Sequence, residues 1–241
     1  NLVLVENPPG LTVREVVGRY KGNTDVEYAE PDYIVQSIAT PNDTLWAQQW
    51  DMTKIKADVA WDTQKNASDV VVVIIDTGID YTHPDLAGNL GNPNEIAGNG
   101  IDDDGNGKVD DTYGYDFVNN DADPADDNGH GTHTAGTIGA VGGNGVGVAG
   151  VNWYVKVLAA KFLNSNAGGT ISRAVLAVDY FTDLKVNRGV NLVATNNSWG
   201  GGGFTQSLLD AVNRGGNAGI LFSASAGNGG SDGIGDNNDA T

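Results

Sequence analysis

Two short segments of the sequence hold side chains that could together perform acid–base catalysis. Asp76 ends an apolar run and is followed by Thr-Gly, whereas His130 stands between two glycines where a helix is expected to begin. Glycine neighbours leave the imidazole room to reach a cleft, and a buried carboxylate can accept a hydrogen bond from the far ring nitrogen. The pair would supply a general base and the carboxylate that orients it, which are two members of an Asp-His-Ser triad.

The same residues allow two other interpretations. Asp-Thr-Gly is a common turn and also the tripeptide of pepsin-like aspartic proteases, in which two carboxylates share one proton. The sequence holds it once, at 76–78, so an aspartic protease would need a homodimer. His130 and His133 could bind a metal together, but the glutamate of the zinc-protease helix motif is missing between them. We therefore expect a structural role for His133, packed or hydrogen-bonded one helical turn further in.

The elements that position these residues are indicated by alternating strand-like and helix-like blocks. Strands are expected at 70–75, 155–162, 190–196 and 220–224, and helices at 132–139, 171–185 and 206–214. The β-branched run before Asp76 fits a strand that is covered on both faces. The repeated order strand, helix, strand predicts an α/β fold, a three-layer sandwich with a mostly parallel central sheet and helices on both faces. Such sheets carry their chemistry at the carboxyl ends of strands, where Asp76, Ser198 and Asn228 fall.

The first 39 residues differ in pattern from the rest of the chain. Short alternating runs at 2–5 and 26–34 predict strands, and they are typical of the last part of a small α/β module. Longer blocks begin at Thr40, so we expect one part at 1–39 and a main domain at 40–241. An ordinary edge strand is the alternative interpretation of 26–34.

Composition restricts the partners of the chain. Its 241 residues include 13 basic and 31 acidic side chains, with a formal net charge of -18, which argues against nucleic acids and anionic membranes. No apolar run approaches the roughly 18 to 20 residues that span a bilayer. With no cysteine, disulfides and thiolate metal ligands are excluded. The acids gather between Asp102 and Asp127, which favours bound cations.

One acidic stretch is similar to a known type of calcium loop. Residues 102–111 contain Asp-x-Asp-x-Asn-Gly, the front half of an EF-hand loop with its turn glycine at position six. Tyr113 stands where the bidentate glutamate should be. The alternative is a merely solvated acidic loop. The calcium ligands that we expect are Asp102, Asp104, Asn106 and Asp110.

The segments around Asp76 and His130, in this order, resemble the subtilisin-like serine proteases, or subtilases. The segment 221–229, which contains Ala-Gly-Asn-Gly, resembles the strand of that family that ends in the oxyanion-hole asparagine, so the resemblance implies that role for Asn228. Asn-Ser-Trp-Gly at 197–200 resembles the edge segment that pairs with the substrate backbone. The substrate contacts that the resemblance implies are Leu163, Gly168, Gly169, Ile171, Ser198, Trp199, Gly200, Ser225, Ala226 and Gly227.

The Gly-Thr-Ser-Met-Ala type of segment that carries the nucleophile in this family does not occur in the sequence. We expect the serine to lie beyond residue 241, so that this piece alone is inactive and the whole is a secreted, calcium-dependent serine endopeptidase. The run at 26–34 resembles the closing strand of the family's inhibitory propeptide, which implies a zymogen whose propeptide binds the cleft in cis. We expect a monomer that binds polypeptides as extended strands. The rival is a noncatalytic calcium-binding or peptide-binding domain that lost its nucleophile.

Two further calcium sites are implied by the resemblance alone. A calcium loop of the thermitase branch of the family matches Asp116, Asp121 and Asp123. The family's high-affinity loop matches Asp43, Asp85, Asn144 and the carbonyls of Val146 and Val148, with Val141 or Gly142 as the first carbonyl ligand. Ca2+ is the cofactor that we expect.

Overall fold

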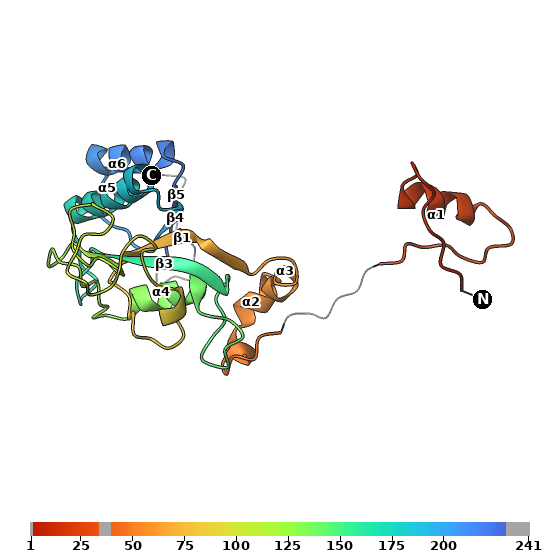
Figure 1. Ribbon diagram of the computed structural model, residues 1–241, viewed down its shortest axis with the longest axis horizontal. Coiled ribbons are helices and arrows are strands. Elements are labelled where there is room, and N and C mark those ends of the chain that lie inside the picture. Colours follow the sequence, from red (N-terminus) through yellow and green to blue (C-terminus); the bar gives the residue numbers. More distant parts are fainter. Residues whose placement is uncertain (1, 34–39, 230–241) are drawn as a thin grey trace. The chain divides into compact units, whose positions relative to one another are not determined.

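The computed structural model describes residues 2–33 and 40–229 and divides the chain into two compact units, Asn1–Ile38 and Ala39–Thr241 (Figure 1). Residue 39, at which we expected the first part to end, lies outside the described residues. Within the described ranges, no helix has the length and apolar character that a bilayer crossing requires.

The described part of the first unit contains one helix, α1 (Val13–Lys21). Thr12 caps this helix, because its hydroxyl accepts a hydrogen bond from the Glu15 amide and its own amide donates to the Glu15 carboxylate at 2.8 Å. The strands predicted at 2–5 and 26–34 do not form at the described positions, 2–5 and 26–33. That prediction was wrong because an alternating run becomes a strand only where another strand pairs with its backbone.

The second unit is built on a five-stranded sheet in which neighbouring strands are parallel. The strands are β1 (Asn66–Asp76), β2 (Gly114–Asp116), β3 (Tyr154–Lys161), β4 (Leu192–Asn197) and β5 (Leu221–Ala224), in the spatial order β2-β3-β1-β4-β5. The central strand β1 pairs with β3 on one side and β4 on the other; Val73 lies between Leu158 and Thr195. Because the strands run the same way, their carboxyl ends meet at one edge of the sheet, and Asp76 lies at that edge.

Helices cover both faces of the sheet, which confirms the predicted three-layer α/β fold (Figure 1). Helices α5 (Ile171–Arg188) and α6 (Gln206–Asn217) lie on one face and α4 (His130–Gly139) on the other. Helix α5 begins after Thr170, whose hydroxyl accepts from the Arg173 amide, and ends at Gly189 in the left-handed region. The remaining helical elements of the described second unit are α2 (Trp50–Lys54), α3 (Ala57–Ala60) and the 3-10 turns Trp46–Gln48 and Ala87–Asn89.

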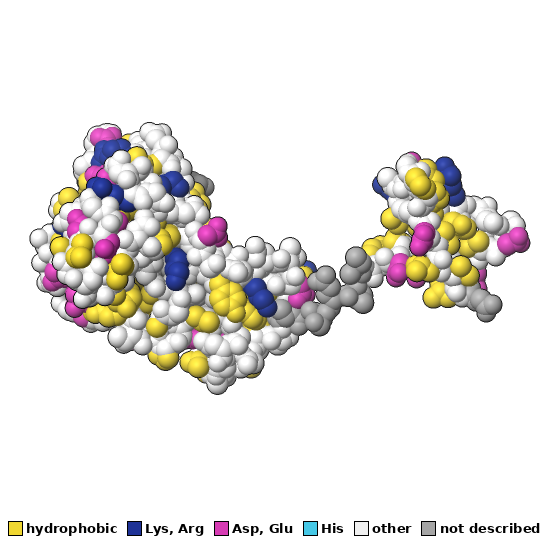
Figure 2. All heavy atoms as spheres, in the orientation of Figure 1, with side chains coloured by type: hydrophobic (Ala, Val, Ile, Leu, Met, Phe, Trp, Pro, Cys, Tyr) yellow, Lys and Arg dark blue, Asp and Glu magenta, His cyan; other side chains and the backbone are white. Residues whose placement is uncertain are grey.

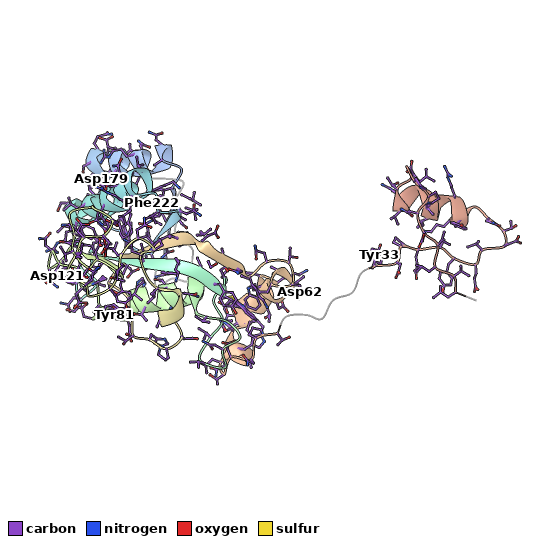
Figure 3. The ribbon with its side chains drawn as sticks, in the orientation of Figure 1. Tyr33, Asp62, Tyr81, Asp121, Asp179 and Phe222 are labelled. Atoms are coloured by element: carbon purple, nitrogen blue, oxygen red, sulfur yellow. The ribbon has the colours of Figure 1, made fainter. Side chains whose placement is uncertain are left out.

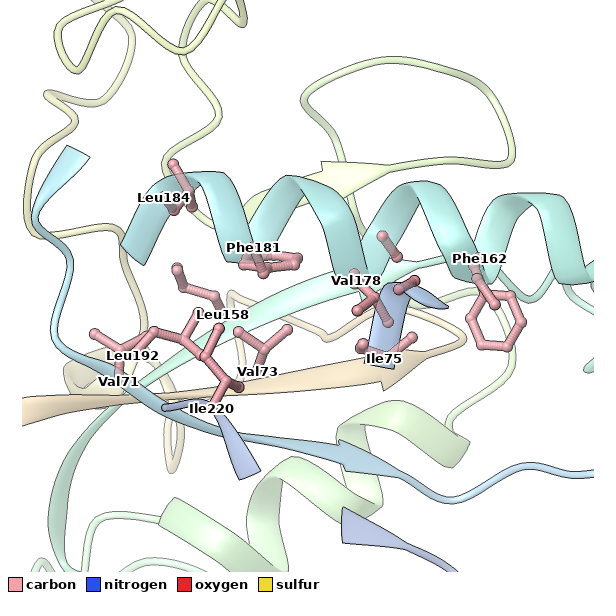
Figure 4. Packing of buried hydrophobic residues seen from close by; sticks show 14 of the residues in the cluster. Val71, Val73, Ile75, Leu158, Phe162, Val178, Phe181, Leu184, Leu192 and Ile220 are labelled. Atoms are coloured by element: carbon pink, nitrogen blue, oxygen red, sulfur yellow. The ribbon is translucent and has the colours of Figure 1, made fainter. Parts of the chain in front are cut away.

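Side chains that alternate along β1 form two separate cores. Val73 and Ile75 pack with Phe181 of α5 on one face (Figure 4). Ile74 packs on the other face with Ala135 of α4. Since successive side chains of a strand point to opposite faces, Asp76 continues the face of Ile74. The last residue of β1 is thereby directed toward the helix that begins with a histidine.

Three tryptophans form a small third core with α2 and α3. Trp61 lies between Trp46 and Trp153, with ring centroids 5.5 Å and 5.2 Å away, and its indole N–H donates to a loop carbonyl at residue 151. On the surface of these helices, Trp50 and Ile55 are exposed, and Figure 2 shows hydrophobic side chains there. The tryptophan core attaches α2 and α3 to the segment that leads into β3.

Candidate active site

The side chains of Asp76 and His130 meet at the carboxyl end of β1. Nδ1 of His130 lies 2.7 Å from Oδ1 of Asp76, and the Asp76 side chain is 0% exposed whereas the imidazole is 47% exposed. An ionised carboxylate can only accept a hydrogen bond, so Nδ1 must carry the hydrogen. Nε2 then keeps the lone pair that a general base requires.

Asp76 is fixed through both its side chain and its backbone. Oδ1 also accepts from the Thr77 amide at 2.8 Å, and the Asp76 carbonyl accepts from the amides of Phe162 and Leu163 at 3.0 Å and 3.2 Å. Oδ2 is buried without a hydrogen-bond partner among the described residues. A carboxylate in this environment stabilises a neighbouring imidazolium, which is the state that the base reaches after it takes a proton.

His130 is the first residue of α4, and glycines on both sides bring it close to β1. Gly129 precedes the helix with φ 102°, in the left-handed region that favours glycine. The Gly131 amide donates to the Thr77 hydroxyl at 2.9 Å. A Cβ on Gly131 would lie 2.1 Å from the carbonyl oxygen of Gly78. The turn after Asp76 and the first turn of α4 therefore touch backbone to backbone.

A further carboxylate, that of Asp126, joins the two motifs. Its oxygens accept hydrogen bonds from the hydroxyls of Thr77 and Thr132 at 2.8 Å and 2.5 Å, and from the amides of Asn128, Gly129 and Thr132. Burial alone would raise the pKa of Asp126, but the bonds donated by Gly129, Thr132 and Asn128 outweigh burial and lower the pKa to about 2. Asp126 is a positioning residue that the sequence did not distinguish from its acidic neighbours.

The Asp126 network should make the stability of the second unit depend on pH in acid. The folded-state pKa of about 2 lies below the ordinary value of 3.8, so the unfolded chain binds the proton more readily as pH falls. This stabilisation is fully present above about pH 4 and is lost as pH falls toward 2. We expect Asp126→Asn to be less stable at pH 7 and to lose less stability between pH 4 and 2, as measured by urea unfolding. A loss of stability between pH 4 and 2 as large as that of the wild type would contradict the assignment.

Lys161, the last residue of β3, is buried beside the same turn. Its ammonium donates to the carbonyl of Thr77 and to the carboxylate of Asp127, both at 2.6 Å, and to the carbonyl of Leu163 at 3.4 Å. A buried lysine needs such acceptors, because an unpaired charge away from water is unfavourable. Lys161 thus joins the turn after Asp76, the segment before α4 and the end of β3.

Of the predicted substrate residues that follow β3, Leu163 contacts Asp76, and the others lie in the segment that leads into α5. Leu163 is buried in the core on the α5 face, and its amide bonds to the Asp76 carbonyl. The carbonyl of Gly168 accepts from the Asn164 amide at 2.9 Å, which closes a turn. A Cβ on Gly169 would lie 2.7 Å from the Leu163 side chain. Ile171, half-buried, begins α5.

The segment after β4 contains Ser198, Trp199 and Gly200. The Ser198 hydroxyl accepts from the Asn196 side-chain amide at 2.9 Å. The Trp199 ring packs against Phe162, with centroids 4.9 Å apart. Gly200 is exposed, and nothing lies within 4 Å of a Cβ built on it. Among the described residues, no serine hydroxyl forms a hydrogen bond with His130, so Ser198 does not complete a triad here.

Strand β5 leads into Ser225, Ala226, Gly227 and Asn228. The Ser225 amide donates to the carbonyl of the last residue of β4 at 3.0 Å, so the chain continues beside that strand. Gly227 has φ 88°, and Asn228 is exposed. Because the sheet is parallel, Asn228 follows β5 at the edge that also carries Asp76, with β4 between the two strands.

His133 lies one helical turn after His130 and is exposed. Its exposure contradicts the packed role that we predicted, and the alternative, a hydrogen-bonded side chain, stays a prediction. Helix α4 buries Gly131 and Ala135. His133 is two residues away from each of them, so it lies on the opposite, exposed side of the helix.

The predicted high-affinity calcium residues lie around the loop after α4. The Gly143 amide donates to Oδ2 of Asp43 at 2.7 Å. The Asn144 side-chain amide and the Val148 amide donate to the two oxygens of Asp85, both at 2.8 Å. Oδ1 of Asp43 is buried without a hydrogen-bond partner among the described residues. Two nearly buried acids thus hold one glycine-rich loop.

The other members of this predicted set are held through their backbone. The Val141 amide donates to the Asp85 carbonyl at 2.8 Å, and the Val146 amide donates to Oδ1 of Asn144 at 2.8 Å. These bonds use amide groups, so they leave the carbonyl oxygens of the two valines as possible metal ligands.

The segment 42–49 is attached to the same loop along its length. Asn42 accepts from the amide at 145 at 3.1 Å, and the Leu45 amide donates to the carbonyl at 147 at 2.8 Å. The Gln49 side chain exchanges two bonds with the backbone at 149, at 2.8 Å and 2.9 Å. The beginning of the described second unit is therefore fixed to the calcium-loop candidate.

The second predicted calcium loop has its acids in different environments. Asp116 is buried, and its Oδ1 accepts from the Val118 amide at 2.6 Å. Asp121 and Asp123 are exposed, and Figure 3 shows Asp121 and Tyr81 in this loop-rich part of the unit. The Tyr81 hydroxyl donates to Asp123 at 2.9 Å, and this bond raises the pKa of Tyr81. Asp116 mainly holds its own loop together.

Two acids of the predicted EF-hand-like set share one donor, because the Asn106 amide donates to Oδ1 of Asp102 at 3.0 Å and to Oδ1 of Asp104 at 2.9 Å. Asp102 accepts from amides of its own loop at 106 and 107, and Asp110 accepts from amides at 99 and 100. Asp104 belongs to a group of three acids whose ligand oxygens lie within 4.8 Å of one another. The other two acids of this group are Glu95 and Asp111, which the sequence pattern did not indicate.

Comparison with known proteins relates the second unit to one group of peptidases. The model of the Subtilase family (Peptidase_S8) matches residues 67–241. A thermophilic serine proteinase of Bacillus sp. (strain AK1) is 39% identical over 220 residues, which cover 91% of this chain and 48% of the relative. Thermitase of Thermoactinomyces vulgaris is 34% identical over 192 residues, which cover 79% of this chain and 59% of thermitase.

A solved structure shows the same similarity in three dimensions. The crystal structure of a cold adapted subtilisin-like serine proteinase aligns with a TM-score of 0.50 and 30% sequence identity, over 68% of this chain and 53% of the other. The chain thus spans about half the length of the relatives described here, 48% and 59% in the two sequence matches.

Proposed function

This chain belongs to the subtilase family, and on that premise we propose that it supplies the acid–base part of a serine endopeptidase. The observation that carries the proposal is the 2.7 Å bond between the buried carboxylate of Asp76 and the half-exposed imidazole of His130. This bond leaves Nε2 free to take a proton. A nucleophilic serine from a segment outside residues 1–241 would complete the triad.

The reaction that this pair supports is acyl transfer in two halves. His130 takes the hydroxyl proton while the serine oxygen attacks the peptide carbonyl carbon, and it gives that proton to the amine nitrogen as the C–N bond breaks. In the second half, His130 takes a proton from water, whose oxygen attacks the acyl-enzyme ester, and returns the proton to the serine. Asp76 remains ionised and stabilises the imidazolium between these steps. Asn228 would donate to the oxyanion, a role that is worth about 10²- to 10³-fold in rate in subtilisin.

We propose that the substrate is a polypeptide bound as an extended strand. The open backbone at Gly200 and the turn at Gly168 and Gly169 support this mode, because strand addition needs exposed main-chain groups. The neighbouring apolar side chains of Leu163 and Trp199 would contact the substrate's side chains. The other residues assigned to this binding edge are Ile171, Ser198, Ser225, Ala226 and Gly227.

We propose that calcium binds at the loop 141–148. The support is that Asp43 and Asp85 are buried beside this loop, while one oxygen of Asp43 lacks a partner among the described residues. A buried carboxylate is unfavourable unless it is paired, hydrogen-bonded or bound to a metal ion. Calcium that binds only the folded chain would stabilise it by about 4 kcal/mol when free calcium exceeds its Kd a thousandfold. The loop with Asp116, Asp121 and Asp123 is the second candidate.

We further propose that the polypeptide acts outside the cell as a monomer and is made as a zymogen. Extracellular calcium sites typically have dissociation constants of about 10⁻⁴ to 10⁻³ M, which suits acidic loops of this kind. Residues 1–39 would be the remnant of an inhibitory propeptide that binds the cleft in cis. The excess of acidic residues, 31 against 13 basic ones, argues against nucleic acids and anionic membranes as partners.

A fluorophosphonate probe on the full-length polypeptide tests the proposed activity, because it labels only an activated serine. We expect one labelled serine outside residues 1–241 and loss of labelling in the His130→Ala variant. Cleavage that a carboxylate-dyad inhibitor stops, without any serine labelled, would instead support a pepsin-like dimer. The absence of both labelling and cleavage would support a binding domain without catalytic function.

A further inference from the structure

Five asparagines of the sequence are followed directly by glycine, at 99–100, 106–107, 128–129, 144–145 and 228–229. Asparagine deamidates most readily before glycine, because glycine has no side chain to hinder the attack of its own nitrogen on the preceding amide. All five glycines have positive φ, between 73° and 102°, so their backbone conformation does not distinguish the five sites. Hydrogen bonding does.

Four of the five asparagines have both ends of the side-chain amide hydrogen-bonded. Their Nδ2 atoms donate to a carboxylate or a backbone carbonyl at 2.8–2.9 Å. Their Oδ1 atoms accept from the backbone amide two residues further on, at 2.7–3.2 Å. These four are Asn99, Asn106, Asn128 and Asn144. Such a side chain cannot turn toward the nitrogen of the next residue without breaking both bonds.

The glycine nitrogens that follow these four asparagines are also hydrogen-bonded. The amides at 100, 107 and 129 each donate to an aspartate carboxylate. The amide at 145 donates to Oδ1 of Asn42 at 3.1 Å. The nitrogen must lose its proton before it attacks, and a neighbouring negative charge disfavours that loss. Both reacting groups are therefore restrained at these four sites.

Asn228 differs from the other four. Its side chain is exposed and forms no hydrogen bond within the described part of the chain. Exposure alone does not distinguish it, since Asn99, Asn128 and Asn144 are exposed as well. The difference is that no bond has to break before the Asn228 side chain turns toward the next residue. We propose that Asn228 is the site at which this chain deamidates first.

The reaction requires only water and hydroxide. The backbone nitrogen of Gly229 gives its proton to hydroxide and attacks Cγ of Asn228. The new C–N bond closes a succinimide ring, and the bond between Cγ and Nδ2 breaks as that nitrogen takes a proton from water and leaves as ammonia. Water then opens the ring at either carbonyl and leaves aspartate or isoaspartate. The net change consumes water and releases ammonia, and it is faster at higher pH.

The consequence for activity rests on the proposed function, in which Asn228 donates to the oxyanion. Aspartate and isoaspartate have a carboxylate in place of the amide, so the donor is lost and a negative charge faces the oxyanion. Loss of such a donor lowers the rate about 10²- to 10³-fold in subtilisin. Deamidation would therefore limit the working life of the enzyme. The modification itself does not require peptidase activity.

Peptide mapping by mass spectrometry of the 241-residue chain, incubated in oxygen-labelled water at mildly alkaline pH, tests the assignment. Ring opening introduces a labelled oxygen and thereby marks each converted asparagine. In the folded chain, Asn228 should convert about 10- to 100-fold faster than the other four, because two or three hydrogen bonds must break at each of those. In concentrated urea these bonds are lost, and all five should convert at similar rates. Equal rates in the folded chain, or faster conversion at any of the other four, would overturn the proposal.

Asp103→Ala tests whether hydrogen bonds protect these sites. Asp103 is exposed, and its Oδ2 accepts from the Asn99 side-chain amide at 2.8 Å. Removal of this one bond should speed conversion at Asn99 about fivefold. The other three protected asparagines report on the fold and should convert at the wild-type rate. An unchanged rate at Asn99 would mean that hydrogen bonds do not protect these sites, and the reason for choosing Asn228 would fail.

Asn228→Asp in the full-length polypeptide separates the modification from the proposed function. This variant has the reaction product at position 228 from the start, and its kcat on a fluorogenic peptide amide should be about 10²- to 10³-fold lower. Wild-type activity should decay during incubation in step with conversion at Asn228. If Asn228 converts first but Asn228→Asp keeps full activity, the oxyanion role is wrong and the deamidation site stands.

Discussion

Replacing His130 with alanine should lower kcat about 10⁶-fold in a polypeptide that includes the proposed nucleophile, which is the loss that removal of the histidine causes in subtilisin of the same family. The variant has no group to take the serine proton, whereas its substrate-binding edge is unchanged, so KM should change little. Asp76→Asn should lower kcat about 10⁴-fold, because a neutral amide favours the wrong tautomer of the imidazole. Initial rates on a fluorogenic peptide amide measure both losses.

His133→Ala is the matched control for these variants. His133 lies in α4 with an exposed side chain, one helical turn from the reacting pair. Its removal should change kcat by less than about twofold, as for a surface substitution away from the site. A loss as large as that of His130→Ala, accompanied by loss of a bound metal, would mean that the two histidines act together on an ion, and the proton-transfer assignment would then be wrong.

Gly131→Ala should damage both stability and activity. Its Cβ would lie 2.1 Å from the carbonyl oxygen of Gly78, which is backbone and cannot rotate away. Helix α4 would have to move outward, which would lengthen the 2.7 Å bond between His130 and Asp76. We expect a stability loss of about 1–3 kcal/mol from overpacking. We also expect kcat to fall about 10²-fold, since a displacement of about 1 Å has that effect. Urea unfolding and peptide hydrolysis measure the two losses.

Gly136→Ala separates this close approach from the general effect of alanine in a helix. Gly136 lies in the same helix, and nothing lies within 4 Å of a Cβ built on it. Alanine favours a helix by up to about 1 kcal/mol relative to glycine. Gly136→Ala should therefore keep its activity and gain stability. Equal behaviour of the two variants would show that the contact between Gly131 and Gly78 is not needed.

The parts of the fold that have strong local signals could be predicted. Strand β1 is a β-branched run that ends in an acid, and α4 begins where glycine precedes His130. The parallel sheet and its helical layers follow from the order of the elements, because right-handed crossovers leave few arrangements. The meeting of Asp76 and His130 is a consequence of this topology, since both stand where their elements come to the same edge.

Strand formation that depends on a neighbour could not be predicted. Strand β2 has three residues and begins with Gly114, where a Cβ would lie 1.9 Å from the carbonyl oxygen of Ala159. It exists because β3 offers a partner, although its own sequence is a poor strand former. The run at 2–5 has a better pattern and forms no strand. Pairing, not alternation, decides both cases.

The residues that support the site were also hidden from the sequence. Asp126 and Asp127 are adjacent, yet one accepts from the hydroxyls and amides around α4 and the other pairs with buried Lys161. Glu95 looks like any exposed acid in an acidic segment until the fold brings it to Asp104. Each role depends on which groups tertiary packing places nearby, and the spacing of residues along the sequence does not indicate those neighbours.

The attachment of residues 42–49 to the loop at 143–149 has a consequence for the proposed zymogen. A cut between the two units would create a new amino terminus only a few residues before Asn42. That end would be anchored by the hydrogen bonds that Asn42 and Asp43 accept from the glycine-rich loop. Docking of the new amino terminus and metal binding would then be one linked equilibrium: withdrawing the anchored end removes a ligand, and removing the ion loosens the end. In the proposed zymogen, the calcium concentration needed for maturation would be set by this loop and not by the catalytic cleft.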